Sequence, residues 1–161
     1  MPVLYYRTPV GIARIIEHDD AIISISIRDE ELEPNEPETD VLKIVAQQFD
    51  EYFEGDRKDF DFPINQPGTG FQQQVWQYLL TIPYGTTTSY GAMSRGMNNP
   101  LAIRAIASAN GKNNLWIVVP CHRVIGSNGS LTGYAGGLWR KQWLLEHEAR
   151  VMGIGQTKLA F

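Results

Sequence analysis

The chain of 161 residues has a single cysteine, Cys121, and few other groups that could bind a metal. One cysteine cannot form an internal disulfide, and the three scattered histidines do not suggest a zinc site. The sequence also has neither a long apolar run nor an N-terminal signal segment. We therefore expect a soluble, cytoplasmic monomer that folds without a metal, a nucleotide cofactor or a membrane.

Acidic residues are missing from the whole stretch between 62 and 145. Residues 1–61 hold sixteen of the eighteen acids against six basic residues, so the net charge of -4 conceals a division along the chain. An acidic part joined to a part without acids can still meet a polyanion. A neutral enzyme core beside a solvated acidic face explains the same pattern equally well.

The first part of the chain, residues 1–62, predicts a small mixed α/β lobe. Two apolar, β-branched runs flank the pair Asp19 and Asp20, which is typical of a β-hairpin. Apolar residues at helical spacing then predict a helix that ends at Gly55. Its packing face would be Val41, Ile44, Val45, Gln48 and Tyr52. Prolines and glycines mark residues 63–68 as a linker.

Residues 69–161 predict a second, mainly helical domain. A core helix capped by Thr69 should stop at Pro83, and two short helices follow on either side of a turn rich in Asn and Pro. Two helices joined in this way fit a helix-turn-helix. We expect Asn99 to cap the second of them. Its core positions would be Leu101, Ile103 and Ile106, and those of the last helix Leu138, Trp139, Trp143 and Leu144.

The second helix of this pair carries one basic side chain among small ones. Arg104 has Ala105 beside it and Ser108 one turn further on. Small side chains let a helix approach a nucleic-acid groove closely, and a single arginine would then project alone. Alanines also serve helix propensity and close helix packing, with the arginine paired to a carboxylate. The missing local acids favour the nucleic-acid interpretation.

Cys121 comes directly after an apolar run and a proline. We predict that residues 117–119 form a buried strand, with Cys121 exposed at its end. Neighbouring positive charge would lower the pKa of the thiol, although a lone cysteine can also be simply a small buried apolar residue. Because an imidazole that accepts a proton needs an orienting acceptor, a relay from Cys121 through water and His122 to Glu146 or Glu148 is chemically reasonable.

Several segments resemble the O6-alkylguanine-DNA alkyltransferases, also called methylated-DNA protein-cysteine methyltransferases. They are GFQQQVWQYLLTIPYGT, TSYGAM, AIRAIASANG, PCHRVIG, GSLTGYAGG and KQWLLEHE. The resemblance covers residues 69–148, whereas the N-terminal lobe is similar to that family's mainly in element order. It implies an α+β fold, with a small ribonuclease H-like lobe before a mainly helical domain that contains the helix-turn-helix.

The resemblance also implies a reaction and a set of site residues. An alkyl group on O6 of guanine, and by extension on O4 of thymine, would pass irreversibly to Cys121 after the nucleotide is flipped out of double-stranded DNA. The implied catalytic residues are Cys121, His122, Glu148, Tyr90 and Asn113. The implied DNA-binding residues are Arg104, Ala105, Ser108 and Tyr90, with Arg104 replacing the flipped nucleotide in the stack. The implied substrate pocket consists of Tyr134, Ala135, Gly136, Val124 and Trp116.

Two other functions remain open at this stage. A helix-turn-helix protein that recognises alkylated DNA without reacting, or that regulates transcription, would leave the PCHRV segment unexplained. A thiol hydrolase or redox enzyme would need a base facing the sulfur or a second cysteine. The range of alkyl groups is open too, because Asn114 stands where the family often has proline and Trp116 is bulky.

Overall fold

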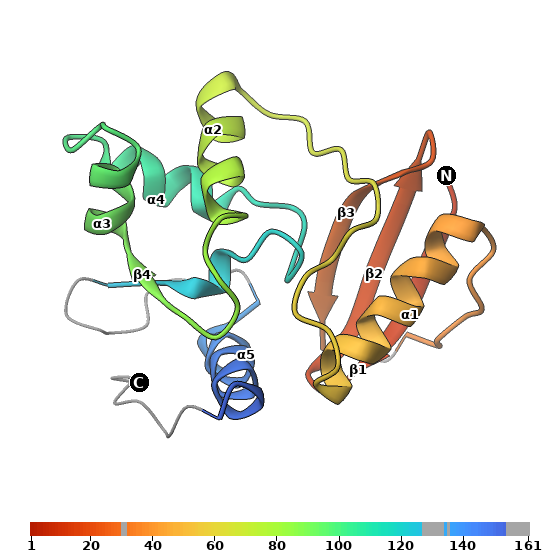
Figure 1. Ribbon diagram of the computed structural model, residues 1–161. Coiled ribbons are helices and arrows are strands. Elements are labelled where there is room, and N and C mark those ends of the chain that lie inside the picture. Colours follow the sequence, from red (N-terminus) through yellow and green to blue (C-terminus); the bar gives the residue numbers. More distant parts are fainter. Residues whose placement is uncertain (30–31, 127–133, 135, 154–161) are drawn as a thin grey trace. The chain divides into compact units, whose positions relative to one another are not determined.

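The computed structural model describes residues 1–29, 32–126, 134 and 136–153, which belong to two compact units. The sheet unit comprises residues 1–67 together with 114–118, and the helical unit comprises 68–113 together with the chain from 119 onward. Figure 1 shows the sheet and helix of the first unit and the helices of the second. Within the described ranges, no helix is long and apolar enough to cross a membrane.

Three antiparallel strands in the order β1-β2-β3 form the sheet of the first unit. They are β1 (Val3–Thr8), β2 (Gly11–His18) and β3 (Ala21–Arg28). The predicted hairpin is confirmed as β2 and β3, which are joined by Asp19 and Asp20 at φ values of 49° and 61°. Two successive positive φ values are the geometry of a type I′ turn, whose twist matches that of the strands.

The helix α1 (Asp40–Glu54) lies across one face of this sheet (Figure 1). Thr39 caps its start, and Gly55 ends it in the left-handed region at φ 87°, as predicted. The predicted packing face is partly wrong, because the side chain of Ile44 is 42% exposed. The residues buried on this helix lie at spacings of three and four and are Leu42, Val45, Gln48, Phe49 and Tyr52.

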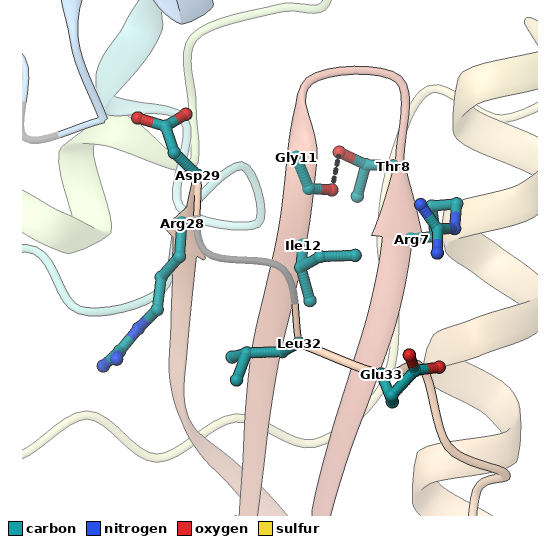
Figure 2. A pocket seen from close by; sticks show the side chains of 8 residues that line it. All are labelled: Arg7, Thr8, Gly11, Ile12, Arg28, Asp29, Leu32 and Glu33. Atoms are coloured by element: carbon teal, nitrogen blue, oxygen red, sulfur yellow. Dashed lines mark hydrogen bonds between the residues drawn. The ribbon is translucent and has the colours of Figure 1, made fainter.

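A pocket of about 490 Å³ lies in the sheet unit beside the turn between β1 and β2 (Figure 2). The hydroxyl of Thr8 donates to the carbonyl of Gly11 over 2.8 Å at its rim. Two arginines and two acids line the pocket, so their formal charges cancel. None of the site residues predicted from the sequence lines it.

The helical unit begins with α2 (Gly70–Leu79). Thr69 caps it as predicted and forms a capping box with Gln72. The helix ends before the predicted Pro83, because turn hydrogen bonds from Thr81 to Tyr78 and from Ile82 to Leu79 replace the helical pattern. The remaining elements are β4 (Thr88–Ser89), α3 (Tyr90–Gly96), α4 (Ile103–Gly111), the 3₁₀ turn η1 (Cys121–Arg123), β5 (Val124–Ile125) and α5 (Leu138–Val151).

The predicted pair of short helices is present as α3 and α4, which pack against each other, and α4 also packs against α2. The indole of Trp76 in α2 donates to the carbonyl of Ala109 in α4 over 2.9 Å. The predicted cap of α4 is wrong, because Asn99 belongs to a turn and its carbonyl accepts the Ala102 amide. Leu101 therefore lies outside the helix and is 96% exposed, and of the three predicted core residues only Ile106 is fully buried.

The apolar run before Cys121 is buried but is not a strand. Ile117 has φ 69°, and the Val118 amide donates to the carbonyl of Trp116 over 2.8 Å, so the backbone turns tightly. Residues 114–118 instead join the sheet unit, where the amide of Ile25 donates to Asn114 over 2.8 Å. An apolar run can be buried in a turn as well as in a strand, and hydropathy alone does not separate the two.

Candidate active site

Cys121 lies in the short turn η1, and a single carbonyl organises the backbone before it. The carbonyl oxygen of Val119 accepts from the Cys121 amide over 2.8 Å and from the side-chain amide of Asn113 over 2.9 Å. Asn113 thus holds the turn that precedes the cysteine. Cys121 is buried, with 8% of its surface exposed, so the prediction that it would be exposed is wrong. Because hydrogen bonds to the Val119 carbonyl hold this turn, the sulfur lies inside the helical unit and not at the end of a strand.

His122 and Glu148 meet in the interior of the helical unit. His122 Nε2 lies 2.8 Å from Glu148 Oε2, and neither residue has exposed surface. Burial lowers the pKa of His122, and this effect outweighs the opposing charge and hydrogen bond of Glu148. A neutral imidazole facing a carboxylate donates its Nε2 proton to it. Nδ1 then carries the lone pair, and it makes no hydrogen bond within the described part of the chain.

The carboxylate of Glu148 is held by more than the histidine. Arg123 donates to it from Nε over 2.9 Å and from Nη2 over 3.1 Å, and the Gly85 amide donates over 3.3 Å. Burial alone would raise the pKa of Glu148, but His122 and Arg123 outweigh it and hold the pKa well below its usual range. Arg123 is fixed in turn by a 2.8 Å bond to the carbonyl of Ile82.

Lys141 is a buried cation near the thiol that the sequence interpretation missed. Its side chain has no exposed surface, and its ammonium lies 6.0 Å from the ring centre of Tyr134. Burial raises the pKa of the Cys121 thiol, while the Asn113 hydrogen bond and the Lys141 charge lower it. Burial lowers the pKa of Lys141 to about 8, although the negative charge of the Cys121 thiolate acts to raise it. The cation therefore favours the thiolate that burial disfavours.

The buried face of α5 explains why Lys141 was missed. The expected packing residues Leu138 and Trp139 are 48% and 52% exposed, whereas the buried residues include three charged ones. Lys141 and Glu148 are seven residues apart, two helical turns on the same face, with the leucines 144 and 145 between them. This seven-residue spacing is the sequence signal that could have identified Lys141, but counting apolar residues alone does not detect it.

Short parallel pairing brings Tyr90 close to the chain that follows Cys121. Thr88 of β4 pairs with Val124 of β5, and α3 begins immediately afterwards at Tyr90. The hydroxyl of Tyr90 accepts a hydrogen bond from Asn110 Nδ2 over 3.3 Å. Tyr90, Val124 and Cys121 therefore share the helical unit, although they are far apart in sequence.

The structure describes the surroundings of some of the other predicted pocket residues. The carbonyl of Gly136 accepts from the buried guanidinium of Arg140 over 2.8 Å. Ala135 lies outside the described residues. Trp116 is buried in the sheet unit, so its place in the substrate pocket stays a prediction. Among the described residues, no group of three or more His, Cys, Asp or Glu side chains could hold a metal ion.

Three of the four predicted DNA-binding residues lie on α4, and the fourth, Tyr90, is the first residue of α3. Arg104, Ala105 and Ser108 are exposed, whereas Ile106 and Ala109 face the core. Within the described ranges no carboxylate forms an ion pair with Arg104. The guanidinium is thus available to a ligand outside the chain.

Two sequence-family descriptions together match nearly the whole chain. The ribonuclease-like domain of 6-O-methylguanine DNA methyltransferase matches residues 3–66, and the DNA binding domain of the same description matches residues 70–150. The boundary between the two matches falls next to the boundary between the two structural units at residues 67 and 68.

Curated proteins and solved structures agree with these matches. The methylated-DNA–protein-cysteine methyltransferase of Mycobacterium bovis is 41% identical over 152 residues, which is 90% of this chain and 92% of that protein. The constitutive enzyme of that name from Bacillus subtilis is 44% identical over 138 residues, which cover 81% of this chain and 84% of the Bacillus protein. The structure of Mycobacterium tuberculosis OGT in complex with DNA has a TM-score of 0.83 at 39% identity and covers 91% and 92% of the two chains. This chain belongs to the 6-O-methylguanine DNA methyltransferase family.

Proposed function

We propose that this protein repairs DNA by direct reversal, accepting the alkyl group of O6-alkylguanine on the sulfur of Cys121. The observation that carries the proposal is the buried contact of 2.8 Å between His122 and Glu148, directly beside the sole cysteine. The curated relatives bear the name of this activity, and one similar structure is a complex with DNA. A regulator that only binds DNA would leave the arrangement of Cys121, His122 and Glu148 unexplained.

The chemistry follows from the protonation states of the site. The imidazole of His122, whose Nε2 proton is directed to Glu148, accepts the thiol proton at Nδ1 through a bridging water. The resulting thiolate attacks the alkyl carbon, so that a C–S bond forms and the C–O6 bond breaks. The guanine leaves with the bonding electrons and takes a proton from Tyr90. The product is a thioether on Cys121.

Access to the alkyl group requires that the nucleotide leaves the duplex. Extruding a nucleotide costs a few kcal/mol, which contacts inside the gap must offset. We assign that role to Arg104, the exposed and unpaired cation of α4 within the described part of the chain. Ala105 and Ser108 let the helix lie close to the minor groove. The assignments of Tyr90, Asn113, Tyr134, Ala135, Gly136, Val124 and Trp116 belong to the same proposal.

The decisive experiment follows the methyl group. Incubation with duplex DNA containing O6-methylguanine, then trypsin and mass spectrometry, should give the peptide of residues 113–123 with one methyl group on Cys121. The Cys121→Ser variant serves as the control and should bind the duplex without modification. An unmodified wild-type peptide together with intact DNA binding would instead support the non-catalytic alternative.

A second comparison tests the assignment of Arg104. Replacing it by alanine should slow methyl transfer from duplex DNA far more than the reaction with free O6-alkylguanine, because the free base needs no extrusion. Both rates are measured by the modified peptide over time. Equal losses on the two substrates would remove the role of Arg104 in holding the duplex open.

The domain boundaries at 1–62, 63–68 and 69–161, the monomeric state and the cytoplasmic location also stay predictions. We infer that the 69–161 domain supplies both the DNA-binding face and the alkyl acceptor, since α4, Tyr90, Cys121 and Glu148 all lie in the helical unit.

A further inference from the structure

Two apolar side chains at the start of α4 face solvent. Leu101 is 96% exposed and Ile103 is 44% exposed, and they stand three residues and one residue before Arg104. Adjacent exposed aliphatic side chains are more informative than a single exposed leucine, because together they form an apolar patch. Arg104, Ala105 and Ser108, which follow them along the chain, are exposed as well.

The exposure of Leu101 is built into the backbone of its turn. The amide of Asn98 donates to Arg95 over 3.0 Å, that of Asn99 to Ser94 over 2.8 Å, and that of Ala102 to Asn99 over 3.0 Å. Asn98 also adopts a positive φ of 56°. The turn thus fixes the backbone on both sides of Leu101, so a ligand would not have to order this part of the chain first.

Charge is scarce on the same surface. Arg123, Arg140 and Lys141, half of the six basic residues between 62 and 145, are buried in the helical unit. The exposed cations on or directly after α3 and α4 are Arg95, Arg104 and Lys112. Since phosphate contacts supply most non-specific affinity for DNA, three cations leave a large share to other contacts.

We propose that Leu101 and Ile103 form an apolar contact with the minor groove of the duplex beside the damaged nucleotide. This rests on the proposed function, because it takes α4 as the helix that meets DNA. Apolar side chains at minor-groove interfaces pack on sugars and base edges and favour an opened or bent duplex. Arg104 follows immediately in sequence, so the apolar pair and the cation reach the same few nucleotides.

Binding without reaction tests the contact directly. The Cys121→Ser protein is titrated with a fluorescent duplex containing O6-methylguanine. The titration is repeated with two double variants, which combine Cys121→Ser with Leu101→Ala or with Ile103→Ala. Each added change should raise the Kd about fivefold, as expected for losing part of the burial of one aliphatic side chain. Leu80→Ala is the matched control, because Leu80 is 42% exposed but lies at the end of α2. It should leave the Kd unchanged.

The salt dependence gives a second readout that misfolding cannot imitate. With three exposed cations, log Kobs should fall with log salt with a slope no steeper than about −3. Leu101→Ala should keep that slope, whereas Leu101→Lys should make it steeper by about 0.9 because a new cation reaches a phosphate. An unchanged slope for Leu101→Lys would overturn the proposal.

The outcomes separate the two proposals. If wild-type protein takes a methyl group from duplex DNA but Leu101→Ala binds like the parent, the apolar contact is wrong and the repair function stands. If wild-type protein takes no methyl group, the repair function fails, whatever the Kd values are. Sedimentation of the same proteins without DNA completes the test, since a dimer that Leu101→Ala dissociates would make this surface a protein interface and overturn the DNA contact.

Discussion

At the scale of single residues, Lys141 has the clearest electrostatic consequence. Its buried ammonium favours the Cys121 thiolate, and burial lowers its own pKa to about 8, so it is mostly charged at pH 7. Lys141→Met should therefore raise the pKa of the thiol and slow its alkylation at pH 7 about tenfold, the effect of one pKa unit. The rate of modification of Cys121 by iodoacetamide across pH measures this directly.

The control for this prediction is Lys43→Met, which removes an exposed lysine from α1. It should leave the pH profile of the thiol unchanged. If Lys141→Met also leaves the profile unchanged, the charge of Lys141 does not act on Cys121.

Glu148 links catalysis to stability. Its pKa is depressed in the folded protein, so the unfolded chain binds the extra proton first when the pH falls. The stabilisation is therefore complete above the ordinary glutamate pKa of about 4.3 and is lost progressively below it. Glu148→Gln should lower the free energy of unfolding at pH 7 by about 3 kcal/mol, because it leaves the buried Arg123 charge uncompensated.

Urea unfolding at pH 7 and pH 4 measures both effects. The wild-type protein should lose more stability between these values than Glu148→Gln, which has no carboxylate to protonate at this site. Glu146→Gln is the matched control, since the carboxylate of Glu146 accepts a hydrogen bond from the nearby Gln142 over 3.1 Å and takes no part in the contacts of Glu148. If Glu148→Gln is as stable as wild type at pH 7, the assigned role of Glu148 is wrong.

At the scale of elements, Gly96 decides how α3 approaches α2. A methyl group at Gly96 would lie 2.1 Å from the hydroxyl oxygen of Tyr78 and 2.8 Å from its ring. Gly96→Ala should destabilise the protein by about 1–3 kcal/mol, the usual range for overpacking, and weaken duplex binding by displacing the helix pair. Gly111→Ala is the control because no atom lies within 4 Å of its added methyl group.

Thermal unfolding and duplex titration check this prediction together. Gly111→Ala should match or exceed the wild-type stability, since alanine favours the helix. Adding Tyr78→Phe to Gly96→Ala should recover part of the loss. Equal stabilities for Gly96→Ala and Gly111→Ala would show that Tyr78 moves aside freely.

At the scale of the whole molecule, one acceptor sets the capacity of the protein. Cys121 is the only cysteine, and a thioether has no leaving route in this site. With excess methylated duplex, the protein should therefore take up one methyl group per chain and then stop. Intact mass spectrometry over time measures the stoichiometry, and continued loss of O6-methylguanine after saturation would contradict single turnover.

Local features of the fold were predictable where the chain itself supplies the cause. The Asp19–Asp20 turn, the Thr69 cap and the Gly55 stop each depend on backbone conformations or hydrogen bonds within a few residues. The start of α4 was not predictable, because Asn99 and Pro100 are common both in turns and at the starts of helices. The buried face of α5 was not predictable for another reason, since the buried carboxylate of Glu148 is stabilised by His122 and Arg123, which are distant in sequence.

The sequence by itself determined the chemistry available to this protein: one thiol, a histidine next to it, and a glutamate two helical turns beyond a lysine. These depend on covalent order and helical period alone. Only the tertiary structure decided that residues 117–119 turn instead of forming a strand, that Arg123 fixes Glu148, and that Leu101 is left in solvent. Burial, ion pairing and exposure arise from contacts between residues far apart in the chain, and no local pattern encodes them.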